Sequence, residues 1–284
     1  MRIGIIAPGA MGAAVAQRLR ARGATVAVTL HGRGPASAAR AAGLAVQASE
    51  AALAGWADVI LSILPPGEAA GLAERLAPVL CPRGAAVIFA DCNAVSPDTV
   101  RAIAASLPGV RVADVGIIGG PPKGEGPGPR FYASGEAAEA LRPLAGWGLD
   151  VRPIGGGIGA ASALKMSYAG IAKGLVAIAS AMALAAARAG AAEALFAELA
   201  ESQPALLAHL RRSLPGMPDK AYRWVAEMEE IEAFLEGMPF APAYLAAARH
   251  YEAIAADQAH PAPDGPVAQL TARFAANPGG EKKA

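Results

Sequence analysis

Short hydrophobic runs alternate with segments of helical spacing along the first half of the chain. Runs rich in β-branched and other apolar residues occur at 2–7, 25–30, 44–47, 57–64, 85–91, 110–115 and 130–134. Between them, apolar residues recur at the spacing of a helix face over 13–22, 36–43, 49–55, 68–80 and 96–107. Strands that alternate with helices form βαβ units, so this pattern predicts an α/β fold with a doubly wound parallel sheet.

The strand pattern stops near residue 158, and the rest of the chain has the pattern of helices. We expect one long helix over 159–189 and further helices over 191–210, 218–236, 241–257 and 267–276. Residues 261–266 are rich in proline and interrupt this series. The expected organisation is an α/β domain at 1–158, an all-α domain at 159–260 and a partly disordered tail at 261–284.

The first expected strand leads into a turn that suits a dinucleotide. In the segment APGAMG at 7–12, Gly9 and Gly12 occupy the second and third glycine positions of G-x-G-x-x-G. Ala7 occupies the first, which the turn tolerates if this alanine keeps a negative φ. The helix N-terminus that follows offers N–H groups and a positive dipole to a pyrophosphate, with Gly9 as the residue of close approach. The predicted phosphate-binding residues are Gly9, Ala10, Met11 and Gly12; the alternative is an α/β turn without a ligand.

The end of the second expected strand favours NADP over NAD. A Rossmann domain that holds NAD has a carboxylate there for the ribose 2′-hydroxyl, and residues 30–37 contain no acid. Arg33 can pair with a 2′-phosphate, assisted by His31 and Ser37. We therefore predict NADP as the cofactor, with NAD as a possibility, and the alternative is that Arg33 is a solvated loop charge.

A lysine lies in a small-residue helix after a glycine-rich hinge. Lys165 follows the hinge at 155–159 and has Ala, Leu and Met neighbours. Burial of an ammonium lowers its pKa unless it finds a partner, and either outcome suits proton transfer. Tyr168, three residues on, shares the face of Lys165. Periodicity alone leaves open that Lys165 is a surface residue whose stem lies along the helix.

Taken together, these segments resemble the β-hydroxyacid dehydrogenase superfamily, which includes 3-hydroxyisobutyrate and 6-phosphogluconate dehydrogenases and the imine reductases. Besides the glycine turn, the likeness rests on DCNAVSP at 91–97, DVGIIGG at 114–120 and KMSYAGI at 165–171, and it covers about residues 1–175. The resemblance implies an NAD(P)-dependent oxidoreductase for a small hydroxy or keto compound, with Lys165 as acid and base. It also implies a homodimer that associates through the helical domain.

Further residues are expected to surround the reacting groups in a cleft between the two domains. Leu64, Pro65 and Pro66 follow the fourth expected strand and are predicted to line the nicotinamide pocket. Asn93 and the backbone of Gly119 and Gly120 are predicted to orient the substrate.

Several positions depart from the family pattern. Ala169 stands where the family usually has Asn, and Ala172 stands where decarboxylating members have Glu. Asn93 and Ile118 replace two serines of the substrate segments. These departures argue against oxidative decarboxylation of 6-phosphogluconate and against the familiar hydroxy acids. Two alternatives therefore stay open: an imine reductase with Tyr168 as proton donor, and a dinucleotide sensor without turnover.

Arg223 is a candidate substrate contact in the helical half. Arg223 and Glu227 are four residues apart on an expected helix, so they either face the cleft or form a surface pair. We predict a substrate-binding role for Arg223, with the exposed ion pair as the alternative.

Charge and composition narrow the possible partners. The formal net charge is +1 without a long run of one sign, which indicates no nucleic-acid-binding surface. Lys165, Lys173 and Arg188 interrupt the apolar stretch at 159–192, so we interpret it as a core helix and expect no membrane association. The two cysteines have neither disulfide nor zinc spacing, which fits a reducing, cytoplasmic compartment. The four histidines form no ligand cluster, and we predict no metal.

Overall fold

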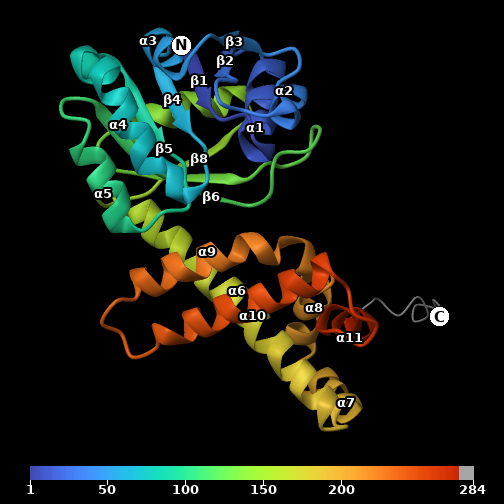
Figure 1. Cartoon of the computed structure of the whole chain (residues 1–284). Coiled ribbons are helices and arrows are strands. Elements are labelled where there is room, and N and C mark those ends of the chain that lie inside the picture. The colour runs from blue at the N-terminus through green and yellow to red at the C-terminus, as the bar shows by residue number, and fades with distance from the viewer. Residues whose placement is uncertain (275–284) are drawn as a thin grey trace. The chain divides into compact units, whose positions relative to one another are not determined.

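The computed structural model describes residues 1–274 and divides the chain into two compact units, Met1–Met166 and Ser167–Ala284 (Figure 1). The long helix α6 (Ala160–Arg188) begins in the first unit and continues into the second. The last part of the predicted disordered tail, from residue 275 onward, lies outside the described residues.

The first unit is built on one eight-stranded sheet. Its strands are β1 (Arg2–Ile6), β2 (Thr25–Thr29), β3 (Ala45–Gln47), β4 (Val59–Ser62), β5 (Ile88–Asp91), β6 (Arg111–Ile118), β7 (Arg130–Ser134) and β8 (Asp150–Pro153). Their order in the sheet is β3-β2-β1-β4-β5-β6-β7-β8. The strand order reverses direction between β1 and β4, so the predicted doubly wound fold is confirmed.

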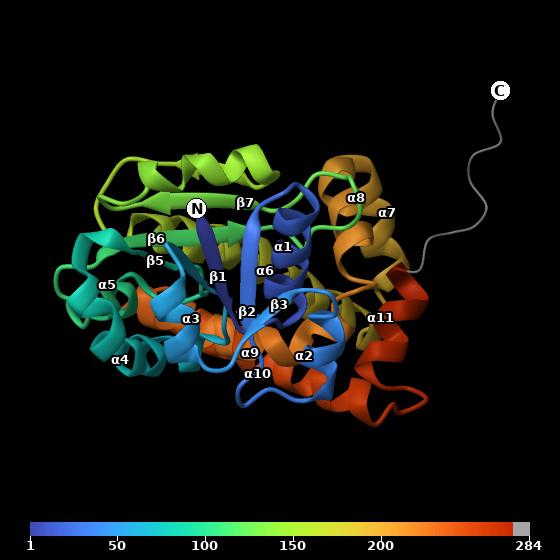
Figure 2. The ribbon, with the colours of Figure 1, turned by 90° about the horizontal axis from the view of Figure 1, so that it is seen from above.

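Helices cover both faces of this sheet. One face carries α1 (Ala10–Ala21), α2 (Pro35–Arg40) and the 3₁₀ helix η3 (Glu139–Trp147). The other carries α3 (Glu50–Trp56), α4 (Ala69–Leu80) and α5 (Pro97–Ala105), and Figure 2 displays these three helices together. Two short 3₁₀ helices, η1 (Pro66–Glu68) and η2 (Cys81–Ala86), flank α4.

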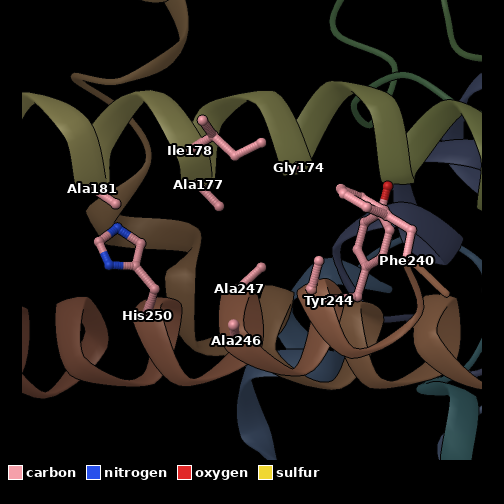
Figure 3. A pocket seen from close by; sticks show the side chains of 10 residues that line it. Gly174, Ala177, Ile178, Ala181, Phe240, Tyr244, Ala246, Ala247 and His250 are labelled. Atoms are coloured by element: carbon pink, nitrogen blue, oxygen red, sulfur yellow. The ribbon is translucent and has the colours of Figure 1, made fainter.

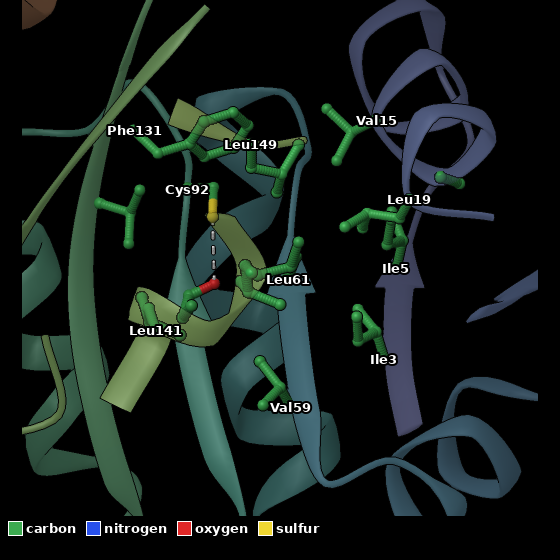
Figure 4. Packing of buried hydrophobic residues seen from close by; sticks show 14 of the residues in the cluster. Ile3, Ile5, Val15, Leu19, Val59, Leu61, Cys92, Phe131, Leu141 and Leu149 are labelled. Atoms are coloured by element: carbon green, nitrogen blue, oxygen red, sulfur yellow. Dashed lines mark hydrogen bonds between the residues drawn. The ribbon is translucent and has the colours of Figure 1, made fainter. Parts of the chain in front are cut away.

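A separate hydrophobic core fills each face. On the α1 face, Val15 and Leu19 point toward Ile5 of β1 and Leu61 of β4 (Figure 4). These side chains are at most 1% exposed. Because β1 and β4 are buried on both faces, their sequences are almost continuously apolar, as expected for central parallel strands.

The sheet differs from the prediction at its far edge. β7 pairs antiparallel with β6, whereas the other neighbouring pairs are parallel. A parallel crossover needs about a dozen residues and usually a helix. The connection at 119–129 is rich in glycine and proline and contains no helix, so the chain returns antiparallel. β8 and η3 were not predicted, because the DVRP sequence of β8 has a single β-branched residue and Pro143 interrupts the helical pattern of η3.

The second unit contains the rest of α6 and five further helices among the described residues. These are α7 (Ala192–Ser202), α8 (Pro204–Ser213), α9 (Pro218–Phe234), α10 (Pro242–Ala259) and α11 (Pro266–Phe274). The predicted single helix at 191–210 is two helices, because Pro204 forces Gln203 out of the helical region, to φ −136° and ψ 51°. α9 and α10 run side by side in Figure 1.

Within the part of the chain that the structure describes, α6 is the one helix long and apolar enough to cross a membrane by length and composition. Buried core helices pass the same test. Two lysines lie on α6, and both have polar partners inside the protein: Lys165 a backbone carbonyl and Lys173 a carboxylate.

Candidate functional site

The turn after β1 folds back tightly on its own backbone. Ala7 has φ 62°, and it is the one residue other than glycine with positive φ among residues 1–274. The expectation of a negative φ at Ala7 is therefore wrong: the turn needs the left-handed conformation here, which costs an alanine roughly 1–2 kcal/mol. The carbonyl oxygen of Ala7 accepts a hydrogen bond from the Gly9 N–H at 2.8 Å. A Cβ on Gly12 would lie 2.4 Å from the same oxygen, so residue 12 must be glycine for packing.

The beginning of α1 is open to a ligand. No heavy atom lies within 4 Å of a Cβ built on Gly9. α1 has no side-chain cap, and its first internal hydrogen bond runs from the Ala13 N–H to the Gly9 carbonyl. The first N–H groups of a helix have no partner within it. This N-terminus lies after β1, at the point where the strand order reverses, which is where α/β sheets bind nucleotides.

A positively charged side chain, that of Arg33, lies just beyond the end of β2. The Arg33 guanidinium is 3.2 Å from a carboxylate oxygen of Glu68, which lies on η1 after β4. The His31 side chain is exposed, and the backbone N–H of His31 donates to Thr29 Oγ1 at 3.3 Å. Ser37 is partly exposed in α2. Of these residues, Glu68 was missed by the sequence analysis, because no spacing rule relates the end of β2 to a residue 35 positions later.

The end of β4 is tied to the end of β5 by one amide. Asn93 Oδ1 accepts from the Leu64 N–H at 2.6 Å, and its Nδ2 donates to Ser62 Oγ and Asp91 Oδ2 at 3.0 and 2.8 Å. Asn93 is 3% exposed. The three bonds fix the chain as it enters Pro65, so the polar atoms of Asn93 serve the protein interior. Its predicted contact with substrate stays a prediction.

Asp91 is a buried carboxyl beside this amide. Burial raises its pKa to about 6, and hydrogen bonds from Asn93 oppose that rise. Asp91 stands opposite Asp114 in the register of β5 and β6. Two carboxyl groups are therefore buried side by side under the carboxyl edge of the sheet.

Lys165 lies on α6 against the carboxyl end of β6. Its Nζ donates a hydrogen bond to the Ile117 carbonyl oxygen at 2.7 Å. Burial lowers the pKa of the Lys165 ammonium below its ordinary value. The chain continues from Ile117 into Gly119, which has φ 125°, and Gly120, around which no heavy atom lies within 4 Å of a built Cβ. The structure thus brings the lysine to the strand that leads into the predicted substrate glycines.

The candidate residues of the second unit are Tyr168 and Arg223, together with Glu227 beside Arg223 on α9. Tyr168 is 53% exposed. Glu227 forms an ion pair with Lys173, so the alternative in which Glu227 pairs with Arg223 is wrong. Arg223 is exposed and lies over the ring of Tyr222 at 5.7 Å. The partner of Glu227 comes from 54 residues earlier in the chain, on α6, which helix spacing within α9 does not reveal.

An apolar groove of about 360 Å³ lies between α6 and α10 in the second unit. Figure 3 places Ala177, Ile178 and Ala181 of α6 opposite Ala247 and His250 of α10. The groove has almost no polar lining, so it lacks the groups that hold a phosphate. Among residues 1–274 no cluster of three or more His, Cys, Asp or Glu side chains is arranged for a metal ion.

Two regions of the chain match known families. Residues 2–144 match the NAD binding domain of 6-phosphogluconate dehydrogenase. Residues 186–254 match DUF1932, a domain of unknown function. Comparison with curated proteins gives no match.

Solved structures resemble the chain over most of its length. The conserved protein MTH1747 of unknown function, described as structurally similar to 3-hydroxyacid dehydrogenases, is 28% identical, with a TM-score of 0.70 over 91% of this chain and 99% of that one. A 3-hydroxyisobutyrate dehydrogenase of Mycobacterium tuberculosis is 22% identical, with a TM-score of 0.73 over 96% and 99%. An imine reductase of Myxococcus stipitatus in complex with NAD+ is 19% identical, with a TM-score of 0.59 over 97% and 99%. The last two likenesses are evidence of a common fold.

Proposed function

The chain belongs to the β-hydroxyacid and 6-phosphogluconate dehydrogenase family of NAD(P)-binding proteins, and on that premise we propose an oxidoreductase that transfers hydride between a nicotinamide dinucleotide and a small hydroxy or keto compound. The observation that carries this proposal is the Lys165 ammonium, held 2.7 Å from the Ile117 carbonyl oxygen at the carboxyl end of β6. An ionisable group at that edge of an α/β sheet is placed where such folds bind their ligands.

The open glycine turn and the lysine lie on the same edge of the sheet. β1, β4, β5 and β6 are parallel neighbours, so their carboxyl ends are aligned. β1 and β6 are three strand spacings apart, about 14 Å. The residues present fit a dinucleotide: the amides of Ala10, Met11 and Gly12 would hold its diphosphate, and Gly9 leaves room for it. The Leu64–Pro66 turn, after the intervening β4, lines the nicotinamide end.

Lys165 moves the proton of the substrate oxygen. The nicotinamide, when bound, accepts or supplies the hydride. In oxidation the neutral amine of Lys165 takes the hydroxyl proton, and in reduction its ammonium protonates the carbonyl oxygen. Because burial lowers the Lys165 pKa, more of the neutral amine is present near neutral pH than in an exposed lysine. Oxidation therefore becomes faster as pH rises through this pKa, and reduction becomes slower.

The substrate is oriented by the backbone of Gly119 and Gly120, which follows directly from β6. Asn93 contributes by fixing the Leu64 N–H and with it the start of the Leu64–Pro66 turn. Arg223 is exposed, with its guanidinium over the Tyr222 ring, and it provides a positive charge for an anionic group of the substrate.

The preferred cofactor is NADP. The Arg33 guanidinium is available at the end of β2, and no acid precedes it there for the ribose hydroxyls of NAD. His31 and Ser37 are the additional donors. Glu68 holds Arg33 in place before the cofactor arrives, at the cost of a negative charge near the 2′-phosphate.

The test of this function is Lys165→Ala on a panel of hydroxy acids, keto acids and cyclic imines with NADPH and NADH. We expect kcat/KM to fall by about 10²–10⁴, while calorimetry gives an unchanged dinucleotide Kd. Lys220→Ala, which removes an exposed lysine of the second unit, is the control and keeps full turnover. The proposal fails if Lys165→Ala turns over its substrate as the parent protein does.

A second candidate function is imine reduction, favoured by the exposed Tyr168 hydroxyl three residues after Lys165 on α6. In that case Tyr168→Phe abolishes the reduction of cyclic imines and Lys165→Ala leaves it intact. A third candidate, a dinucleotide sensor, is indicated by cofactor binding without turnover on the whole panel.

The helical unit forms a homodimer in this proposal. Ile171, Ile178 and Met182 on α6 are 73%, 58% and 56% exposed, which is unusual for large apolar side chains on one helix. The apolar groove between α6 and α10 adjoins Ile178 and offers a surface without charge. A second copy of the chain covers both, in keeping with the association expected for this family.

A further inference from the structure

Two buried side chains on neighbouring strands contact the beginning of α6. Asp114 on β6 and Ser134 on β7 stand opposite each other in the antiparallel register. They are 1% and 0% exposed, and Ser134 Oγ donates to Asp114 Oδ2 at 3.1 Å. We call this pair the clamp.

The clamp binds the first turn of α6. Asp114 Oδ2 accepts from the N–H groups of Gly159 and Ser162 at 2.9 and 3.0 Å, and Oδ1 accepts from the Ser162 hydroxyl at 2.7 Å. Ser134 Oγ accepts from the Ala161 N–H at 3.0 Å. First-turn N–H groups have no partners within their helix, and a carboxylate is favoured there by the helix dipole. The sheet, and not the preceding loop, therefore caps α6.

The same strand contacts α6 at two further positions. A Cβ on Gly116 would lie 2.7 Å from the Ala161 carbonyl oxygen and 3.2 Å from Lys165 Cβ, so helix and strand backbones touch here. One residue later, the Ile117 carbonyl accepts from Lys165 Nζ. Lys165 is three residues beyond Ser162, a rise of about 4.5 Å along the helix. The position of α6 along and against β6 thus determines where the Lys165 ammonium lies.

We propose that Asp114 and Ser134 are positioning residues, which clamp the first turn of α6 to the sheet and thereby hold the Lys165 ammonium at the Ile117 carbonyl. The catalytic meaning of this inference rests on the proposed function of Lys165. The position of the Lys165 amine in the free protein, in contrast, can be tested without any substrate. If the clamp loosens, the first turn moves away from β6 and the amine gains access to water.

The decisive experiment measures the ionisation of Lys165 in the free protein. The chain has six lysines, so reductive ¹³C-methylation followed by NMR titration resolves them, and Lys165→Arg assigns the signal. Ser134→Ala removes the acceptor of the Ala161 N–H without changing the number of charges. The carboxyl groups of Asp91 and Asp114 that lie near this site are still present in the variant. We expect the Lys165 pKa to rise by about one unit toward that of exposed lysines.

Gly116→Ala is an independent variant that pushes α6 off β6 through its added Cβ, and the Lys165 pKa rises in it as well. The matched control is Ser180→Ala. Ser180 is a buried serine on α6, its hydroxyl donates to the Val176 carbonyl, and it lies far along the helix from the clamp. We expect the Lys165 pKa to be unchanged in Ser180→Ala, even if this variant lowers the free energy of unfolding as much as Ser134→Ala does.

The inference is overturned if Lys165 titrates in Ser134→Ala as it does in the parent protein, whether or not Gly116→Ala folds. Measurement of kcat and KM in Ser134→Ala tests the proposed function separately from the clamp. With Lys165 as acid and base, Ser134→Ala lowers kcat and leaves KM unchanged. A shifted Lys165 pKa with unchanged kcat supports the clamp and contradicts the catalytic role of the lysine.

Discussion

Gly9 and Gly12 look equivalent in the sequence and have opposite surroundings in the structure. Gly12 faces the Ala7 carbonyl, where a Cβ would come to 2.4 Å, whereas nothing lies within 4 Å of a Cβ on Gly9. The φ of Gly9 is −68°, which any residue adopts. Gly12 is thus required by the fold, and Gly9 is left free for a ligand.

The two glycines can be separated by substitution. Gly12→Ala is expected to destabilise the protein by about 1–3 kcal/mol, because the turn must move to admit the methyl group. Gly9→Ala is expected to keep the melting temperature and to weaken dinucleotide binding by about tenfold or more, since the methyl group keeps the diphosphate off the helix N-terminus. Thermal unfolding and calorimetry with NADPH check the two effects. An unchanged Kd in Gly9→Ala contradicts the assignment of the turn.

At the scale of elements, the ion pair of Arg33 and Glu68 joins the end of β2 to η1. Both ends belong to the carboxyl edge of the sheet, so in the proposed cofactor site Arg33 already has a partner before a ligand binds. An exposed pair of this kind contributes at most about 1 kcal/mol to stability. Its importance is for cofactor choice.

Substitution of each partner should change cofactor choice in opposite directions. Arg33→Ala raises the KM for NADPH by about tenfold to a hundredfold, because charge-assisted hydrogen bonds to the 2′-phosphate are lost, and leaves the KM for NADH unchanged. Glu68→Gln lowers the KM for NADPH, because a competing negative charge is removed. Glu139→Gln, which breaks the exposed pair with Arg142 on η3, is the control and changes neither constant. A parent protein with a clear preference for NADH contradicts the assignment.

At the scale of the whole molecule, the chain consists of two units that share α6. The sheet unit carries the glycine turn, the Arg33–Glu68 pair and Lys165. The helical unit carries Tyr168, Arg223 and an apolar surface on α6. A solvent-exposed helix face with several large apolar side chains is stabilised when another protein surface covers it.

Charges on that face should separate the proposed dimer. Ile178→Glu and Met182→Glu each place a carboxylate among apolar contacts, so we expect light scattering behind a sizing column to give the mass of a monomer. Val46→Glu alters an equally exposed apolar residue on β3, 51% exposed, and leaves the dimer mass unchanged. If the parent protein already has the monomer mass at micromolar concentration, the homodimer is excluded.

The sequence by itself determined the class of fold and the place of the glycine turn. Both depend on local patterns: apolar runs of strand length, helical spacing between them, and glycines where a backbone must turn sharply. The alternation predicts parallel βαβ units, whereas the order β3-β2-β1-β4-β5-β6 is known from the structure. The catalytic role of Lys165 remains a prediction, as do the substrate contacts of Asn93 and Arg223.

Only the tertiary structure decided which residues far apart in the sequence contact one another. It gave Ala7 a positive φ, because the turn must return over α1. It paired Glu227 with Lys173 and Arg33 with Glu68, and it joined Asp114 to the beginning of α6. These partners are 35 to 54 residues apart in the chain. Sequence patterns record the surroundings that a residue needs, such as a buried or a solvated face, but the identity of a contact across the core is fixed only when the elements pack.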